Sequence, residues 1–270
     1  MMADETKPNT DEQETGMGMD EIENVFALRG KNVGCSVKLR GKVVLIAFLI
    51  NDGESSWDPE SEKIMVSSLK QISTKLMNDS GLDRSGLDIA YAYCQVKVPY
   101  AVGKHNSSQF VQDVLRQFGH SDVQSYQKHY ENKFSRDEAC VSFVFNKRFR
   151  AYAVSVTGEG GSRQEDPAGN EYSIVDFDPK NPQGSERTFI HELMHQFGAI
   201  DYYYPERLAI EAEHYMPGSI MNAGDTIDDV TRYVIGWTDT LSSKAKAFLK
   251  EISKIPQAEI ESAQRDQWLD

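Results

Sequence analysis

Apolar and polar positions alternate along the chain in the patterns of strands and helices. Residues 43–50 form an unbroken apolar run from Val43 to Ile50, which is typical of a strand buried on both faces. Asp58 followed by Pro59 then signals the start of a helix, and apolar residues recur at helical spacing as far as Gly81. The pattern therefore predicts a strand followed by a crossover helix.

The alternation continues through the middle of the chain. Residues 88–98 predict a second strand, and the apolar positions in 111–118 predict a helix that ends at Gly119. Two further strands are expected at 140–146 and 151–156, and the short basic turn between them favours a hairpin. One of these two strands should therefore run antiparallel to its neighbour.

The last third of the chain indicates a change of architecture. A short strand is expected at 173–177, followed by a helix that starts near Ser185. After Gly198 the pattern is mostly loop, until helical stretches at 226–235 and 241–252. We therefore predict an α/β fold of mixed α+β type. It has a mostly parallel sheet with an antiparallel edge strand and flanking helices, then a smaller helical and loop subdomain.

Composition predicts three parts of the chain. Residues 1–24 are acidic and poor in aromatic residues, so they predict a flexible tail. Residues 25–198 should form the upper sheet-and-helix subdomain and residues 199–270 the lower one. The first thirty residues lack the apolar run of a secretory signal peptide, and no apolar run is long enough to cross a bilayer. We expect a cytoplasmic protein, or one exported without a cleaved signal peptide.

Charge narrows the functional classes. The formal net charge is -13, and lysines and arginines are scattered rather than clustered. Such a chain repels nucleic-acid phosphates and anionic lipid head groups. Neither nucleic acid nor a membrane is therefore an expected partner. The oligomeric state cannot be inferred from these features.

The chemistry is concentrated in one short motif, His191-Glu192-Leu193-Met194-His195. On a helix, His191 and His195 are one turn apart and share a face, so both imidazoles can reach one metal ion. Glu192 lies about 100° round the helix from His191, close enough to touch a water on the metal without being a ligand. The spacing indicates two ligands and one general base.

Two residues after the motif complete a metal site. Gly198 stands where the helix must end in a left-handed conformation, which glycine adopts without strain. The chain can then turn back, so that Asp201 supplies a third ligand. Two imidazoles and one carboxylate leave a fourth tetrahedral position open for water, as in catalytic zinc sites. The sequence therefore predicts one zinc ion per chain.

These residues resemble the metzincin clan of metallopeptidases, whose motif is His-Glu-x-x-His-x-x-Gly-x-x-His/Asp. Members of the clan also have a turn that contains methionine near the metal, and Gly218-Ser219-Ile220-Met221-Asn222 is similar to it. The resemblance implies a zinc-dependent endopeptidase in which Met221 is structural. It also implies that an extended peptide or protein substrate pairs with the edge strand at 151–156.

The sequence departs from the clan at the oxyanion stabiliser. Several of its families place a tyrosine two residues after the methionine of the turn, whereas this chain has Ala223. Nearby aromatic side chains could replace it as donors to the developing negative charge. The candidates are Tyr202, Tyr203, Tyr204, His214 and Tyr215.

Other interpretations of the motif remain open. A zinc-binding interaction module without turnover would not need Glu192. An iron(II) oxygenase can also use two histidines and a carboxylate, but the helical spacing and the lack of barrel-like strands disfavour it. The third ligand could be a later glutamate, Glu211 or Glu213. We favour Asp201, because only that choice gives the Gly198 turn a purpose.

The three cysteines lack a short metal-ligand spacing. Cys35, Cys94 and Cys140 are therefore expected to be free thiols. Cys35 allows one alternative, in which its thiolate reaches back and blocks the zinc.

Overall fold

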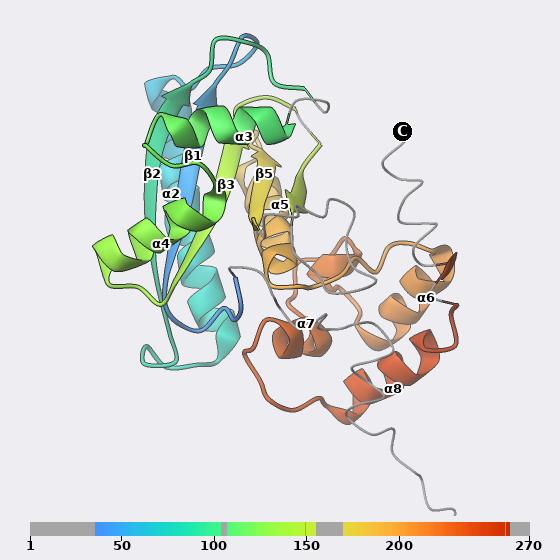
Figure 1. Ribbon diagram of the computed structural model, residues 1–270. Helices are drawn as coiled ribbons and strands as arrows, with labels where there is room; N and C mark the ends of the chain where they lie inside the picture. Colours follow the sequence, from blue (N-terminus) through green and yellow to red (C-terminus); the bar gives the residue numbers. More distant parts are fainter. Residues whose placement is uncertain (1–35, 104–106, 149, 155–169, 257, 260–270) are drawn as a thin grey trace, which may run out of the picture.

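The computed structural model describes residues 36–103, 107–148, 150–154, 170–256 and 258–259. A central sheet carries helices on both of its faces, and several short helices gather at one end of it (Figure 1). The tail expected at residues 1–24 lies outside the described residues, as does Cys35. Among the described helices, none combines the length and the apolar character needed to cross a membrane.

The sheet has five strands in the order β2-β1-β3-β5-β4. The first four run parallel to one another, and β4 runs antiparallel to β5 at the edge. This confirms a mixed, mostly parallel sheet with an antiparallel edge strand. The strands are β1 (Gly41–Asn51), β2 (Leu87–Lys97), β3 (Glu138–Phe145), β4 (Tyr152–Val154) and β5 (Tyr172–Asp176).

The predicted hairpin of the strands now labelled β3 and β4 is wrong, because β5 lies between them. The chain leaving β3 is held towards the end of β1: Lys147 Nζ lies 2.6 Å from Asp52 Oδ2 and 3.0 Å from Glu54 Oε2. It therefore does not fold straight back on β3. β5 supplies the hydrogen-bonding partner that both strands need, parallel to β3 and antiparallel to β4.

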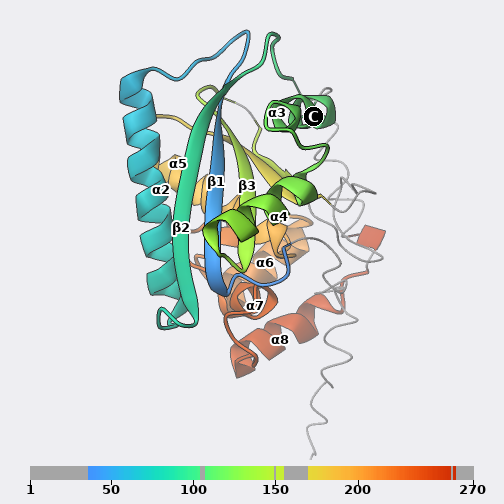
Figure 2. The same ribbon diagram turned by 60° about the vertical axis from the view of Figure 1, so that its left-hand side comes forward.

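Helices α2 (Pro59–Ser80) and α5 (Pro182–Gln196) cover one face of the sheet, here called the α2/α5 face. Helices α3 (Ser107–Arg116) and α4 (Val123–Phe134) cover the other, the α3/α4 face (Figure 2). The ends predicted for α2 are confirmed, since Asp58 caps its first turn and Gly81 follows it with φ +68°. The sequence pattern missed α4, in which few residues are buried.

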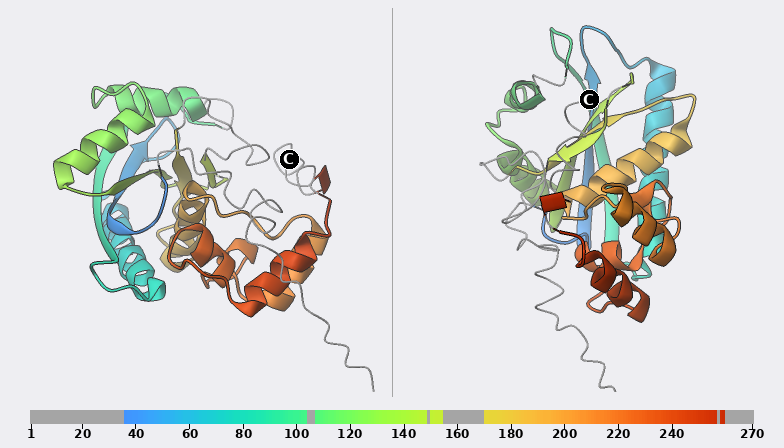
Figure 3. Two further views of the ribbon diagram at one scale, coloured as in Figure 1. Left: turned by 60° about the horizontal axis from the view of Figure 1, so that its bottom comes forward. Right: turned by 90° about the vertical axis from the view of Figure 1, so that its right-hand side faces the viewer.

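The lower part of the molecule contains α6 (Glu206–Tyr215), the 3-10 turn η2 (Ile220–Asn222), α7 (Asp229–Val234) and α8 (Ser243–Ile252) (Figure 3). Helix α6 corrects the expectation of loop up to residue 226. Its start has no side-chain cap, and only Leu208 and Ala212 of the helix are buried. One hydrophobic core runs from the α2/α5 face into these helices.

Candidate metal centre

Helix α5 is fixed at both ends before it presents any functional group. Asn181 caps its start by accepting a hydrogen bond from Gly184 N at 3.2 Å. At its other end Gln196 is fully buried, and its Nε2 donates to Ser173 Oγ at 3.1 Å and to Val141 O at 3.3 Å. The residue next to His195 is therefore anchored on the sheet.

Backbone carbonyls orient both imidazoles. His191 Nδ1 lies 2.9 Å from the carbonyl oxygen of Ile220, and His195 Nδ1 lies 2.6 Å from that of Ala199. A carbonyl only accepts, so Nδ1 carries the proton in each ring and the Nε2 of a neutral ring keeps its lone pair. The two Nε2 atoms are 3.1 Å apart. Both lone pairs therefore converge on one region.

Gly198 makes the turn that follows the helix. Its φ is +89°, and the hydrogen bonds from Ala199 N to Met194 O and from Gly198 N to His195 O close a Schellman motif. This turn directs the Ala199 carbonyl at His195 Nδ1 and returns the chain to the helix at Asp201. One glycine thus serves both the orientation of an imidazole and the approach of a carboxylate.

Asp201 completes a triangle of acceptors. Its Oδ1 lies 3.1 Å from the Nε2 of His191 and 3.1 Å from that of His195, and among the described residues it accepts no hydrogen bond. Two neutral imidazoles protonated on Nδ1 and one carboxylate make three acceptors, which repel one another unless a proton or a metal cation lies among them. Two imidazole nitrogens and one carboxylate oxygen, each 3.1 Å from the other two, are ligand types that would hold a zinc ion. The residues present therefore fit a divalent metal ion.

Charge and burial act differently on the two carboxyl groups. Burial alone would raise the pKa of Asp201, but the imidazoles of His195 and His191 hold that pKa well below its usual range. Burial raises the pKa of Glu192 to about 8, so without a metal ion its carboxyl group readily keeps a proton. His191, Glu192 and His195 form a candidate metal-binding group whose ligand atoms lie within 4.8 Å of one another. Asp201 Oδ1 is the carboxylate oxygen seen in contact with both imidazoles.

The structure separates the five aromatic candidates for the oxyanion stabiliser. Tyr203 stacks beside His191, with ring centroids 6.2 Å apart and an interplanar angle of 27°. Tyr202 is buried in the core, whereas Tyr204 lies on the surface with its ring against Tyr203. The remaining two pack on each other at the end of α6: His214 and Tyr215.

The other predicted residues also have defined places. Met221 is completely buried in η2, the turn whose Ile220 carbonyl contacts His191. Glu213 lies exposed on α6, and Glu211 is half-buried there. Cys94 is half-buried and Cys140 is buried.

Sequence reasoning missed the groups that orient the ligands. The carbonyls of Ile220 and Ala199 have no signature, because every residue carries one. Ser219 and Asp228 are buried and hydrogen-bonded to each other near η2. The one signal available was Asp228 ahead of Val230 and Thr231, a helix N-cap pattern.

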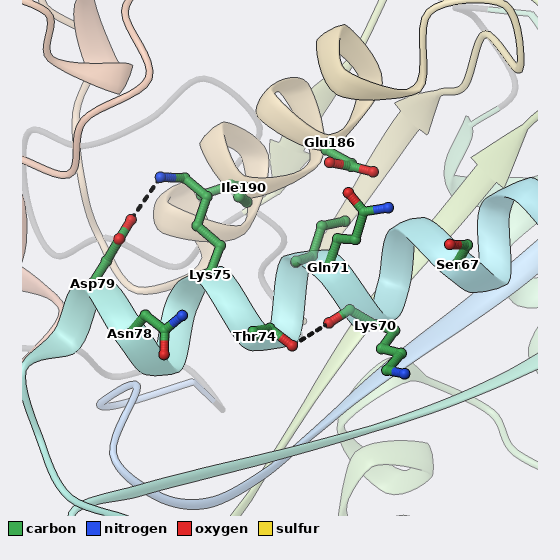
Figure 4. Close-up of a pocket in the computed structure, with 10 residues that line it drawn as sticks. Ser67, Lys70, Gln71, Thr74, Lys75, Asn78, Asp79, Glu186 and Ile190 are labelled. Carbon is green, nitrogen blue, oxygen red and sulfur yellow. Dashed lines mark hydrogen bonds and ion pairs between the residues drawn. The ribbon is translucent and has the colours of Figure 1, made fainter.

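A separate groove of about 590 Å³ lies between α2 and α5 (Figure 4). Glu186 and Ile190 line it from α5, and Lys70 and Lys75 are among the residues that line it from α2. None of the residues in the candidate metal centre lines this groove. It therefore marks a part of the α2/α5 face that is distinct from the centre.

Comparisons with known proteins give limited information. No known protein family and no curated protein match the sequence. Among solved structures, one that matches is metalloproteinase-II from Bacteroides fragilis, at 15% sequence identity and a TM-score of 0.31. The match covers 69% of this chain and 53% of that one, so the chain spans about half the length of the structure it matches. Any function must therefore be assigned from the geometry of the centre itself.

Proposed function

We propose that the protein is a zinc-dependent endopeptidase of metzincin type, with one zinc ion held by His191, His195 and Asp201. The observation that carries the proposal is the triangle of two imidazole nitrogens and one carboxylate oxygen, 3.1 Å on each side. Both imidazoles retain some exposure, 15% and 17% of their side-chain surface, so solvent can reach the cluster. The clan resemblance agrees with η2, where the buried Met221 follows the carbonyl that orients His191.

Glu192 is the proposed general base. A zinc ion at the centre supplies a Lewis acid, which polarises a carbonyl group and makes water more acidic. Glu192 takes the proton of the attacking water and delivers it to the leaving amine. Its buried carboxyl group, with a pKa raised by burial, is suited to hold that proton between the two steps. Peptide hydrolysis then needs no covalent bond between the protein and its substrate.

The substrate is proposed to lie along β4. This strand forms the edge of the described sheet and packs against α5. An extended peptide can add to a sheet edge through backbone hydrogen bonds, which recognise main chain rather than particular side chains. Such pairing would carry a peptide bond past the helix that presents Glu192.

Tyr203 is the oxyanion stabiliser we favour. It is the candidate that lies beside His191, and its neighbour Tyr202 is buried in the core. Removing only the hydroxyl, in Tyr203→Phe, should lower kcat while KM and zinc affinity stay unchanged. Wild-type kcat in that variant would show that the Tyr203 hydroxyl does not stabilise the oxyanion and that the ring only lines the site.

The central test combines metal analysis with a search for cleavage products. Protein purified without added metal should contain about one zinc ion per chain. Proteome-derived peptides incubated with wild-type protein should show cleavages that are missing with Glu192→Gln. Zinc without any cleavage would favour an inactive zinc-binding module, and iron in place of zinc would favour an oxygenase.

A further inference from the structure

Consecutive carbonyls of the turn η2 contact one proposed metal ligand, His191, and the residue that follows another, Asp201. The carbonyl of Ile220 accepts from His191 Nδ1 at 2.9 Å. The next carbonyl, of Met221, accepts from Tyr202 N at 2.8 Å, and Tyr202 directly follows Asp201. A shift of this turn would therefore move one imidazole and the segment that carries the carboxylate.

Ser219 holds the turn in place from inside the protein. It has no exposed surface, and its Oγ accepts from Met221 N at 3.1 Å. The same hydroxyl donates to Asp228 Oδ2 at 2.6 Å. One side chain thus links the backbone of η2 to a carboxylate that follows it in the chain.

Asp228 is itself fixed by the start of α7. Its Oδ1 accepts from Val230 N at 2.9 Å and from Thr231 N at 3.0 Å, which caps the helix. Its Oδ2 accepts from Ser219 and also from Thr231 Oγ1 at 2.7 Å. The two carboxylate oxygens therefore have different roles: Oδ1 caps α7, and Oδ2 accepts the hydrogen bond from Ser219.

The loop around η2 has little freedom to adjust. A Cβ atom added at Gly224 would lie 1.9 Å from the carbonyl oxygen of Gly218, so the two ends of the loop touch through their backbones. Ile220 N also donates to Thr226 O at 2.8 Å. A closed loop of this kind transmits a displacement at Ser219 to the carbonyls of η2.

We infer that Ser219 and Asp228 are positioning residues for the metal centre: through η2 they set the orientation of His191 and the approach of Asp201. The inference rests on the proposed metal site. It assigns to Asp228 Oδ2 a role separate from the helix cap made by Oδ1. Groups that orient metal ligands affect metal affinity and coordination geometry, which can be measured without turnover.

The test compares Ser219→Ala with Ser242→Ala. Both remove a serine hydroxyl that accepts from a backbone N–H in the lower part, but Ser242 caps α8 and, within the described part of the chain, makes no hydrogen bond to η2. Zinc affinity is measured by competition with a chelator, coordination by the absorption bands of the cobalt(II) form, and stability by unfolding of the metal-free protein. Ser219→Ala should weaken zinc binding by about fivefold or more and shift the cobalt bands, since direct partners of ligands contribute about 10–100-fold. Ser242→Ala should lose stability but keep wild-type affinity and bands.

Wild-type zinc affinity and cobalt bands in Ser219→Ala would overturn the inference and leave the proposed metal site intact. A wild-type protein that binds neither zinc nor cobalt(II) would overturn both the inference and the proposed metal site.

If Ser219→Ala does not fold, Asp228→Asn replaces it, because the amide oxygen can keep the helix cap while the amide nitrogen faces Ser219. The same loss of affinity is then expected, and wild-type behaviour rejects the inference. Normal metal binding without hydrolysis in the wild type would reject the peptidase alone.

Discussion

The cores on the two faces of the sheet contain different kinds of side chain. On the α3/α4 face the core is rich in aromatic rings, where Phe143 stacks on Phe48 at 5.2 Å and meets Phe110 edge-on at 5.2 Å. The sheet, α3, α4 and the segments next to them form this core. Nothing in it carries a charge, so its contribution is to stability.

The α2/α5 face has a mainly aliphatic core that continues into the lower helices. Helix α5 contributes Phe189 and Leu193 to that core, yet between them it carries His191 and Glu192. The same helix therefore packs in the core and carries the candidate metal centre. Helices α3 and α4 pack in the core of the other face and carry no part of that centre. The comparison suggests that activity and stability can be changed separately, depending on the face that is altered.

Glu192→Gln should show the largest difference between an effect on activity and an effect on stability. The change removes a base and keeps a side chain of similar size, so hydrolysis should fall by about a thousandfold or more, roughly 4 kcal/mol in transition-state stabilisation. Zinc content and thermal midpoint should stay close to those of the wild type. Turnover on a cleaved peptide, measured beside elemental analysis, checks both statements. Undiminished turnover would remove Glu192 from the mechanism.

The converse change is Phe143→Ala on the α3/α4 face. The ring is fully buried, so its loss should destabilise the protein by about 3–4 kcal/mol through lost burial and a cavity. The remaining folded protein should bind zinc as the wild type does. Denaturant unfolding of the metal-free protein gives the first value, and chelator competition the second. Weaker zinc binding by folded Phe143→Ala would show that the two faces are coupled.

Asp201→Ala tests which carboxylate is the third ligand. Zinc affinity should fall at least about tenfold, because a charged ligand is removed from a preformed site. Glu211→Ala and Glu213→Ala serve as controls and should leave the affinity unchanged. Chelator competition on all three variants decides between them. Normal affinity in Asp201→Ala, with a loss in either glutamate variant, would contradict the proposed metzincin-type site.

The smallest effect is expected in the groove between α2 and α5. Lys75 and Asp79 form a surface pair at 2.7 Å on successive turns of α2, and both side chains are partly exposed. Lys75→Ala should change the free energy of unfolding by less than about 0.5 kcal/mol, with turnover and zinc affinity unchanged. An altered turnover would extend the functional part of this face beyond the metal centre.

Strong local signals in the sequence predicted their elements well. The apolar run of β1 fits a central strand, and Asp58 and Gly81 stand at the two ends of α2. Helices α4 and α6 bury few residues, and the sequence pattern missed both. The place of β5 between β3 and β4 depends on pairing between distant segments, which local patterns do not contain.

In the candidate metal centre, too, some features follow from the local sequence and others depend on the tertiary structure. Helical spacing predicted that His191 and His195 would share a face, and Gly198 predicted the turn that brings Asp201 to them. Both inferences needed only local geometry. The partners of the imidazole Nδ1 atoms, and the bond from Ser219 to Asp228, depend on tertiary structure.

Gly224 sets a limit on how this protein can vary. A side chain there would collide with the backbone of Gly218, which cannot swing aside as the end of a flexible side chain can. The adjacent Ala223 is exposed and has φ +63°, a conformation that glycine or asparagine adopts with less strain. Substitutions selected for folded, metal-binding protein should therefore be confined to glycine at position 224, while position 223 accepts replacements that improve on its present residue.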